Sequence, residues 1–177
     1  LRTPFVLATS YLGPDGFKST EIADIYKSTN ATWPNGSLIR VILRPRSESD
    51  TALLGAMFPG MAAAIETARR RPDIPIAATD QDNLTLAERL PGSLAGSSLT
   101  QLQTEERHLR LVPIDGVTPS VKALESGAYP FGKALYFVVP ATKKKGTERF
   151  IAFINSPQGQ QVLRATGSLL VADQAVR

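Results

Sequence analysis

The sequence of 177 residues contains no cysteine. This absence excludes disulfide bonds, thiol catalysis and cysteine-ligated metal sites, and it leaves every compartment open, the periplasm included. Histidine occurs once, as His108 within a polar run, so a site built from several histidines is excluded as well. Because a histidine needs placed partners to act as a base, we expect His108 to be a surface residue.

Long apolar runs are also missing. No run approaches the roughly 20 residues that a membrane-spanning helix needs, and the longest, such as residues 134–141, have the length of a strand. Residues 1–4 lack the basic and apolar regions of a signal peptide. The chain does not start with methionine, so we expect a processed or shortened form.

Charged side chains are few, at 20% of the residues, against 42% hydrophobic residues. This balance predicts a globular protein rather than a disordered one. The net charge of +4 suits an anionic ligand. No basic stripe is interleaved with aromatic residues, so a nucleic-acid partner is not predicted. The densest basic run, residues 143–145, precedes Gly146 and predicts a solvated turn.

Strand-sized apolar runs alternate with helical patterns along the chain, which favours an α/β architecture. Strands are expected over residues 5–8, 38–43, 74–78, 93–99, 109–114, 134–139 and 168–171. Helices are expected after a cap at Ser19 or Thr20, over 50–57, 60–70, 84–90, 101–107 and 121–126, after Thr147, and after Ser156. No internal repeat is found, and the clearest boundary lies near residues 110–135.

Residues 39–51 read Ile-Arg-Val-Ile-Leu-Arg-Pro-Arg-Ser-Glu-Ser-Asp-Thr and carry the pattern of an anion site. The apolar residues 41–43 predict a buried strand, and Arg44 and Arg46 follow where that strand emerges. A hydroxyl-rich stretch, residues 47–51, leads into a helical segment. The first amides of a helix lack internal partners, the helix dipole adds positive charge, and arginine offers a planar fork to oxyanions. The alternative is an ordinary helix cap made by the same side chains.

Several stretches resemble, in the same order, motifs of the substrate-binding proteins of phosphate ABC transporters. They are the Arg…Ser-Asp-Thr loop within residues 41–51, the Ile-Asp-Gly-Val-Thr-Pro turn at 114–119, the Tyr-Pro-x-x-Lys-x-Leu-Tyr stretch at 129–136, and Ser-Pro-Gln-Gly-Gln at 156–160. The family has Ser-Gly-Thr in the first stretch, and arginine in place of Lys133. The resemblance covers nearly the whole chain.

The resemblance implies an α/β fold of the periplasmic-binding-protein-like type II class, here lacking the N-terminal part of the first lobe. Residues 1–112 are expected to form the second lobe, which carries half of the anion site. Residues 113–177 are expected to form the hinge return and the C-terminal part of the first lobe. The strand at 134–139 and the helices at 147–166 would then expose apolar edges, so a partner chain that completes the first lobe is expected.

The resemblance also implies a function. The chain is expected to bind inorganic phosphate or a similar oxyanion without catalysis, with no cofactor or metal, and to deliver it to an ABC transporter permease. Its expected location is the periplasm, or the cell exterior at the envelope. Arg44 would pair with ligand oxygens, and Ser49 and Thr51 would donate hydrogen bonds. The full set of expected ligand residues is Arg44, Ser49, Thr51, Asp50, Arg46 and Gln81, with Asp80 as an alternative to Gln81.

Asp50 departs from the family pattern, which has glycine at this place. An acidic side chain beside an anion lowers affinity unless it turns away or accepts the proton of a protonated oxyanion, and it removes the backbone freedom of glycine. With part of the first lobe missing as well, a weakened half-site is expected. Sulfate, molybdate or no anion at all therefore stay open as alternatives.

Two other classes of function compete with the binding protein. A hydrolase that uses a serine is disfavoured, because the sequence has no Gly-x-Ser-x-Gly motif and only one histidine. An interaction or signalling module is the second alternative. In that case the chain would be derived from a binding protein and would have no transport ligand.

Overall fold

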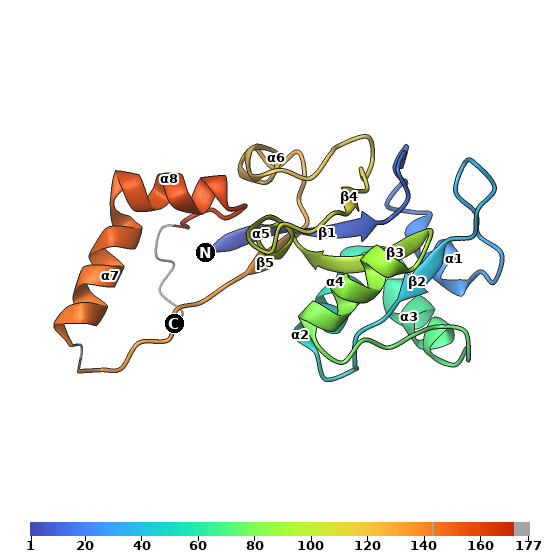
Figure 1. The fold of residues 1–177 in the computed structure, drawn as a ribbon, viewed down its shortest axis with the longest axis horizontal. Coiled ribbons are helices and arrows are strands. Elements are labelled where there is room, and N and C mark those ends of the chain that lie inside the picture. The colour runs from blue at the N-terminus through green and yellow to red at the C-terminus, as the bar shows by residue number, and fades with distance from the viewer. Residues whose placement is uncertain (143, 172–177) are drawn as a thin grey trace.

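The structure is a computed structural model of the chain, and it describes residues 1–142 and 144–171. Figure 1 shows a sheet with helices around it at one end and a separate pair of helices at the other. The strands are β1 (Arg2–Thr9), β2 (Arg40–Ile42), β3 (Ser93–Ser98), β4 (Arg110–Leu111) and β5 (Gly132–Ala134). The helices are α1 (Ile22–Lys27), α2 (Ser49–Met57), α3 (Met61–Arg69), α4 (Asp80–Arg89), α5 (Leu99–Thr104), α6 (Val121–Glu125), α7 (Lys145–Asn155) and α8 (Pro157–Ala165).

The sheet is built around β1, which is buried at every position except Arg2. The strand order is β2-β3-β1-β4, and β5 also pairs with β1. β2 runs parallel to β3, whereas β1 is antiparallel to β3, β4 and β5. Because β2 ends beside β3 at Ile42, the residues that follow it emerge at one edge of the sheet, next to the start of α2.

Helices cover both faces of the sheet, and the alternation along β1 reflects this. Phe5 and Leu7 pack into the larger core with side chains from α1, α2 and α3. Val6 and Ala8 face the other side, where they pack with side chains from α4 and α5. The α/β architecture expected from the sequence is therefore confirmed.

Two of the expected helix patterns are matched closely. The pair expected at 50–57 and 60–70 is confirmed as α2 and α3, separated at Gly60, which has a left-handed φ of 72°. Ser156 caps α8 by accepting a hydrogen bond from the Gly159 amide, as expected. The expected cap at Thr147 is wrong, because α7 already begins at Lys145. The caps expected at Ser19 or Thr20 are also displaced, since Glu21 precedes α1.

The strands expected at 38–43 and 93–99 are shortened to β2 and β3, and four others are reduced further. The strand expected at 134–139 ends at Ala134, which lies opposite Arg2, the first residue of β1. Two others are reduced to single bridges, Leu43 with Ile76 and Arg2 with Leu169. The fourth, expected at 109–114, is only the two residues of β4. Apolar runs alone therefore do not determine how long a strand is.

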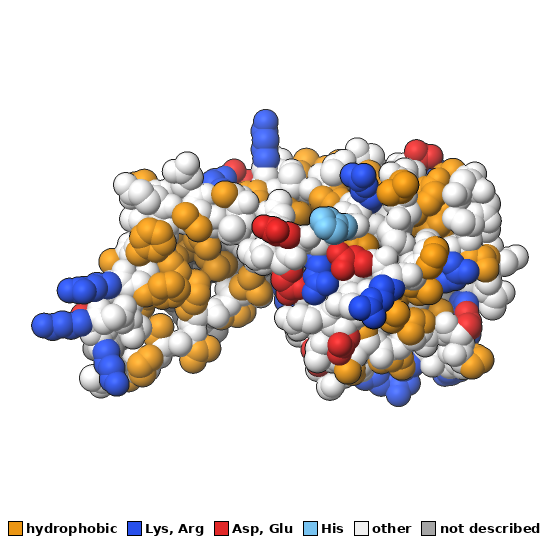
Figure 2. Space-filling view, viewed as in Figure 1, with side chains coloured by type: hydrophobic (Ala, Val, Ile, Leu, Met, Phe, Trp, Pro, Cys, Tyr) orange, Lys and Arg blue, Asp and Glu red, His pale blue; other side chains and the backbone are white. Residues whose placement is uncertain are grey.

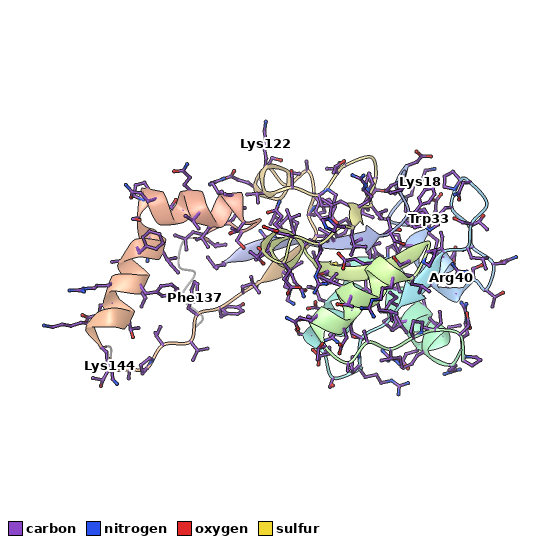
Figure 3. All side chains as sticks on the ribbon, viewed as in Figure 1. Lys18, Trp33, Arg40, Lys122, Phe137 and Lys144 are labelled. Carbon is purple, nitrogen blue, oxygen red and sulfur yellow. The ribbon has the colours of Figure 1, made fainter. Side chains whose placement is uncertain are left out.

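An apolar surface lies beside α7 and the segment 135–139. Figure 2 shows hydrophobic side chains gathered there, and Figure 3 shows Phe137 between the extended segment and α7. The ring of Phe137 meets that of Phe150 edge-on, with centroids 5.5 Å apart. The exposed apolar side chains of this surface are Tyr136, Phe137, Val138, Val139, Phe150, Phe153 and Val162. Within residues 1–142 and 144–171, no helix is long and apolar enough to cross a bilayer.

Candidate functional site

Arg44 is the centre of the candidate site. It follows β2 and Leu43, and its side chain is only 8% exposed. Its Nη1 donates to the Ala77 carbonyl at 2.7 Å, and its Nη2 lies 3.3 Å from Glu48 Oε2 and 3.0 Å from Asp80 Oδ1. The buried Nε has no partner among the described residues. Part of the guanidinium is thus neutralised by the chain itself, and one donor is left free.

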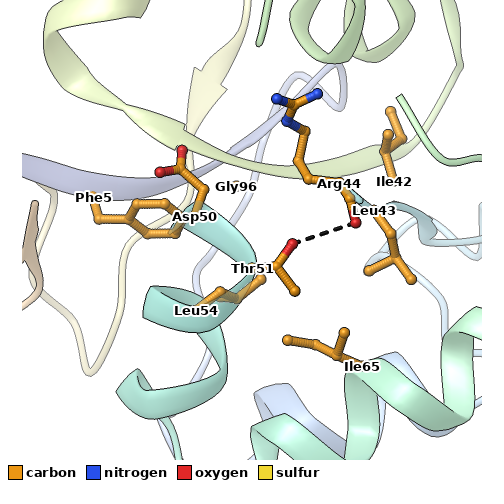
Figure 4. Close-up of a pocket in the computed structure, with 9 residues that line it drawn as sticks. All are labelled: Phe5, Ile42, Leu43, Arg44, Asp50, Thr51, Leu54, Ile65 and Gly96. Atoms are coloured by element: carbon orange, nitrogen blue, oxygen red, sulfur yellow. Dashed lines mark hydrogen bonds between the residues drawn. The ribbon is translucent and has the colours of Figure 1, made fainter. Parts of the chain in front are cut away.

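The loop between Arg44 and α2 is held from two sides. Thr51 Oγ1 donates to the Pro45 carbonyl at 2.9 Å and approaches the Arg44 carbonyl at 3.3 Å (Figure 4). Arg69, at the end of α3, donates to the same Arg44 carbonyl at 2.9 Å. The Thr51 hydroxyl hydrogen is therefore engaged by the loop, and its donation to a ligand would require that bond to break.

The first turn of α2 offers backbone donors. The amides of Thr51 and Ala52 both bond to the Glu48 carbonyl. The amides of Ser49 and Asp50, the first two of the helix, have no backbone or side-chain acceptor among the described residues. Since the helix dipole places partial positive charge at these groups, the first turn of α2 can receive an anion. Ser49 is exposed and adds a hydroxyl.

Asp50 is held away from solvent, at 8% exposure, beside β5. Its Oδ1 lies 2.5 Å from Lys133 Nζ. The contact is a close ion pair that lacks the alignment of a hydrogen bond. The negative charge of Asp50, in the first turn of α2, is thus compensated by the positive charge of Lys133.

One small pocket is lined by Arg44, Asp50 and Thr51, and Figure 4 shows it in close-up. Its other walls are apolar or backbone, and they come from Phe5, Ile42, Leu43, Leu54, Ile65 and Gly96. Its volume of about 10 Å³ is close to what one water molecule needs. The pocket is therefore too small to enclose an oxyanion.

The other two expected ligand residues point to different partners. Arg46 forms a two-pronged ion pair with Glu66 of α3, which raises the pKa of Arg46 and lowers that of Glu66 through the hydrogen bonds between them. Gln81 donates to Glu105 at 3.3 Å. Asp80 and Gln81 lie in the first turn of α4, and of the two it is Asp80 that reaches Arg44. His108 is exposed, as expected.

The start of α4 fixes where Asp80 lies. Thr79 accepts a hydrogen bond from the Asp82 amide at 3.0 Å, and its own amide donates to the Asp82 carboxylate at 3.1 Å. This reciprocal pair is a capping box. Asp80 is the first residue of the helix that follows, so the cap determines the position of the carboxylate that faces Arg44.

Thr79→Ala is expected to lower the free energy of unfolding by about 1 kcal/mol, the usual loss when a helix cap is removed. Chemical denaturation monitored by circular dichroism measures this loss. Ser120→Ala is the matched control, because Ser120 caps α6 by accepting from the Ala123 amide at 3.0 Å and lies away from Arg44. Both variants should lose similar stability. An unchanged denaturation curve for Thr79→Ala would show that the capping box does not stabilise α4.

A family model described as a PBP superfamily domain matches residues 1–158. The chain belongs to this superfamily. No curated protein matches the sequence of this PBP superfamily chain. Within its described residues no group of three or more histidine or acidic side chains could hold a metal ion.

Solved structures share the fold. A phosphate ABC transporter substrate-binding protein with bound phosphate from Clostridium perfringens aligns with a TM-score of 0.73 at 16% identity, over 97% of this chain and 70% of that one. PstS from Borrelia burgdorferi gives 0.66 at 18% identity, with the same coverage. A phosphate transport receptor from Vibrio cholerae gives 0.63 at 13%, over 96% and 70%. The expected resemblance and the periplasmic-binding-protein-like fold are confirmed.

The pairs that shape the site were not predicted from the sequence. Glu48 was expected only as part of the loop, and Lys133 only as a position where the family has arginine. Arg69 lies in the last turn of α3, and its hydrogen bond to the Arg44 carbonyl depends on how α3 packs against the loop. The usable signal in the sequence was that two positions depart from the family pattern. Asp50 stands where the family has glycine, and Lys133 stands where it has arginine.

Proposed function

We propose that this chain is a non-catalytic binding protein for an inorganic oxyanion, with phosphate as the first candidate, and that the first turn of α2 is the binding site. The observation that carries the proposal is the buried, unpartnered Nε of Arg44, together with two amides of the first turn of α2 that have no acceptor among the described residues. A buried donor without a partner is costly to a fold, and an oxyanion oxygen would satisfy it. Ser49, Asp50 and Thr51 form the same turn.

Phosphate is the preferred ligand because solved structures with this fold are described as phosphate-binding proteins. Solved structures with this fold include proteins described as phosphate ABC transporter substrate-binding proteins, one with phosphate bound. By analogy, the chain would pass its ligand to an ABC transporter permease and work in the periplasm or at the outer side of the envelope. Arg46 and Gln81 would join the site only if they left Glu66 and Glu105.

We also propose the division into two parts expected from the motifs, residues 1–112 and 113–177. In this proposal the first part is a second lobe that carries the anion half-site, and the second returns through β5 into a first lobe. The chain spans about 70% of the length of the structures it matches. The apolar surface around Phe137 and Phe150 would then be covered by further polypeptide that completes that lobe, either in the same protein or as a partner chain.

The test is a titration of the ¹⁵N-labelled chain with phosphate, sulfate or molybdate, followed by amide NMR. Saturable shifts of the Ser49 and Asp50 amides are expected with phosphate, because hydrogen bonding to an anion moves the signal of the donating group. Sodium chloride at equal ionic strength is the control for screening. Shifts that scale only with ionic strength, or that fall elsewhere in the chain, would contradict the proposed site.

A second candidate is an interaction module that has no transport ligand. The observation in its favour is that Glu48 and Asp80 already lie against the Arg44 Nη2 atom, where ligand oxygens would bind. A chain that supplies its own carboxylates can be stable without an anion. In this case none of the three oxyanions would produce saturable shifts, and the apolar surface around Phe137 would be the functional feature.

A further inference from the structure

The candidate anion site has more acidic side chains than basic ones. Three carboxylates lie at or near the first turn of α2, those of Glu48, Asp50 and Asp80. Two cations face them, Arg44 and Lys133. An added oxyanion brings further negative charge to this group, and like charges in a partly buried setting repel strongly because solvent screens them little. Binding therefore depends on how each carboxylate is neutralised.

Asp50 is the carboxylate that most needs neutralisation. Glu48 and Asp80 have side chains 40% and 45% exposed, so water solvates them, whereas the Asp50 side chain is 10% exposed. Asp50 also belongs to the same first turn as the two free amides. Its own negative charge competes with a ligand for the positive end of the helix dipole.

Lys133 is the one cation within ion-pair distance of Asp50 among the described residues, with Nζ 2.5 Å from Oδ1. It reaches the site from a different part of the fold. β5 lies antiparallel to β1, with Lys133 opposite Thr3, and this pairing fixes the stem of the lysine. The Lys133 side chain is itself only 20% exposed, so the ion pair is largely shielded from solvent.

We propose that Lys133 is a positioning residue for oxyanion binding: it neutralises Asp50 and holds its carboxylate against β5, away from the free amides of α2. This role rests on the proposed function of the α2 site. Lys133 does not need to touch the ligand. It allows a residue with negative charge to occupy the second position of an anion-binding helix.

The expected result is a charge-dependent loss of affinity. Lys133→Met keeps much of the apolar stem and removes the charge, so Asp50 is left buried and unpaired. Phosphate affinity should fall at least about tenfold, as expected when the partner of a desolvated charge is removed. Lys133→Arg should retain most of the affinity. Lys122→Met is the matched control, because Lys122 is exposed on α6 and points into solvent (Figure 3), and it should bind as the unmodified chain does.

Asp50→Asn separates this role from simple loss of packing. The amide has the size of the carboxylate and no charge, so this variant should bind phosphate more tightly than the unmodified chain, and equal or weaker binding would count against the role of Lys133. In the Asp50→Asn background, Lys133→Met should change affinity by less than about twofold, since the charge it compensates is gone. Thermal unfolding of the unmodified chain, the two single variants Lys133→Met and Asp50→Asn, and the double variant shows whether each is folded at the titration temperature.

The outcomes distinguish this role from the proposed function. If the unmodified chain binds none of the oxyanions, the proposed function and the role of Lys133 fail together. If it binds phosphate and Lys133→Met binds equally well, the role of Lys133 alone is overturned. A purely structural role predicts a lower unfolding temperature for Lys133→Met without the restoration of affinity by Asp50→Asn. Should Lys133→Met not fold, tighter binding by Asp50→Asn supports the role and equal or weaker binding overturns it.

Discussion

Arg44→Met is expected to weaken phosphate binding roughly 10- to 100-fold, the range that corresponds to a lost hydrogen bond to a charged group. Two effects act in the same direction. The variant removes the unpartnered Nε that would receive a ligand oxygen. It also leaves Glu48 and Asp80 without the cation that they share, so two carboxylates would face the arriving anion. Isothermal titration calorimetry at low ionic strength measures the change.

The same substitution should destabilise the fold. The Ala77 carbonyl loses its donor from Nη1, and a buried acceptor left unpaired costs about 1–3 kcal/mol. Arg40→Met is the matched control, since Arg40 lies on β2 four positions earlier and has an exposed side chain that donates to Pro91. It removes the same charge from the protein but not from the site. Equal affinity losses in the two variants would mean that net charge, and not the guanidinium of Arg44, attracts the anion.

Local patterns predicted several helices, because the signals that start and stop a helix lie within a few residues of its ends. Pro59 and Gly60 mark the break between α2 and α3, and Ser156 with Pro157 marks the start of α8. Such signals act within one turn of the chain, so sequence reasoning can find them. The strands were less predictable, because a strand needs a neighbouring edge. The apolar run at 134–139 is a strand only at Ala134, opposite Arg2 at the start of β1.

The candidate site was predictable as a location but not as a balance of charges. The sequence placed Arg44 at the end of a strand and Asp50 in the first turn of a helix, and both positions hold. It did not reveal that Arg44 is shared by Glu48 and Asp80, or that Asp50 is paired with Lys133. The pairs with Asp80 and Lys133 join residues far apart in the chain, and their formation depends on how α4 and β5 pack. Whether the site attracts an anion depends on these pairs.

Gly92→Ala is expected to give the largest loss of stability, about 2–5 kcal/mol, from backbone strain and a steric clash together. Gly92 precedes β3 and has a φ of 71°, which favours glycine. A Cβ built there would lie 2.4 Å from the Leu38 carbonyl oxygen, so the backbone would have to move. The Gly92 carbonyl accepts from the Trp33 indole at 3.1 Å and from the Arg40 amide at 2.9 Å. A shift would therefore weaken the contact between β2 and β3 as well.

Gly36→Ala provides the matched control for this prediction. Gly36 also has a left-handed φ, 83°, but no atom lies within 4 Å of a Cβ placed there. It should lose only the strain of a side chain in this conformation, about 1–2 kcal/mol. The difference between the two variants in urea denaturation isolates the clash with Leu38. Because β2 leads directly to Arg44, Gly92→Ala should also weaken oxyanion binding, whereas Gly36→Ala should not. Equal stability losses would show that the close approach of Gly92 to Leu38 is relieved at no cost.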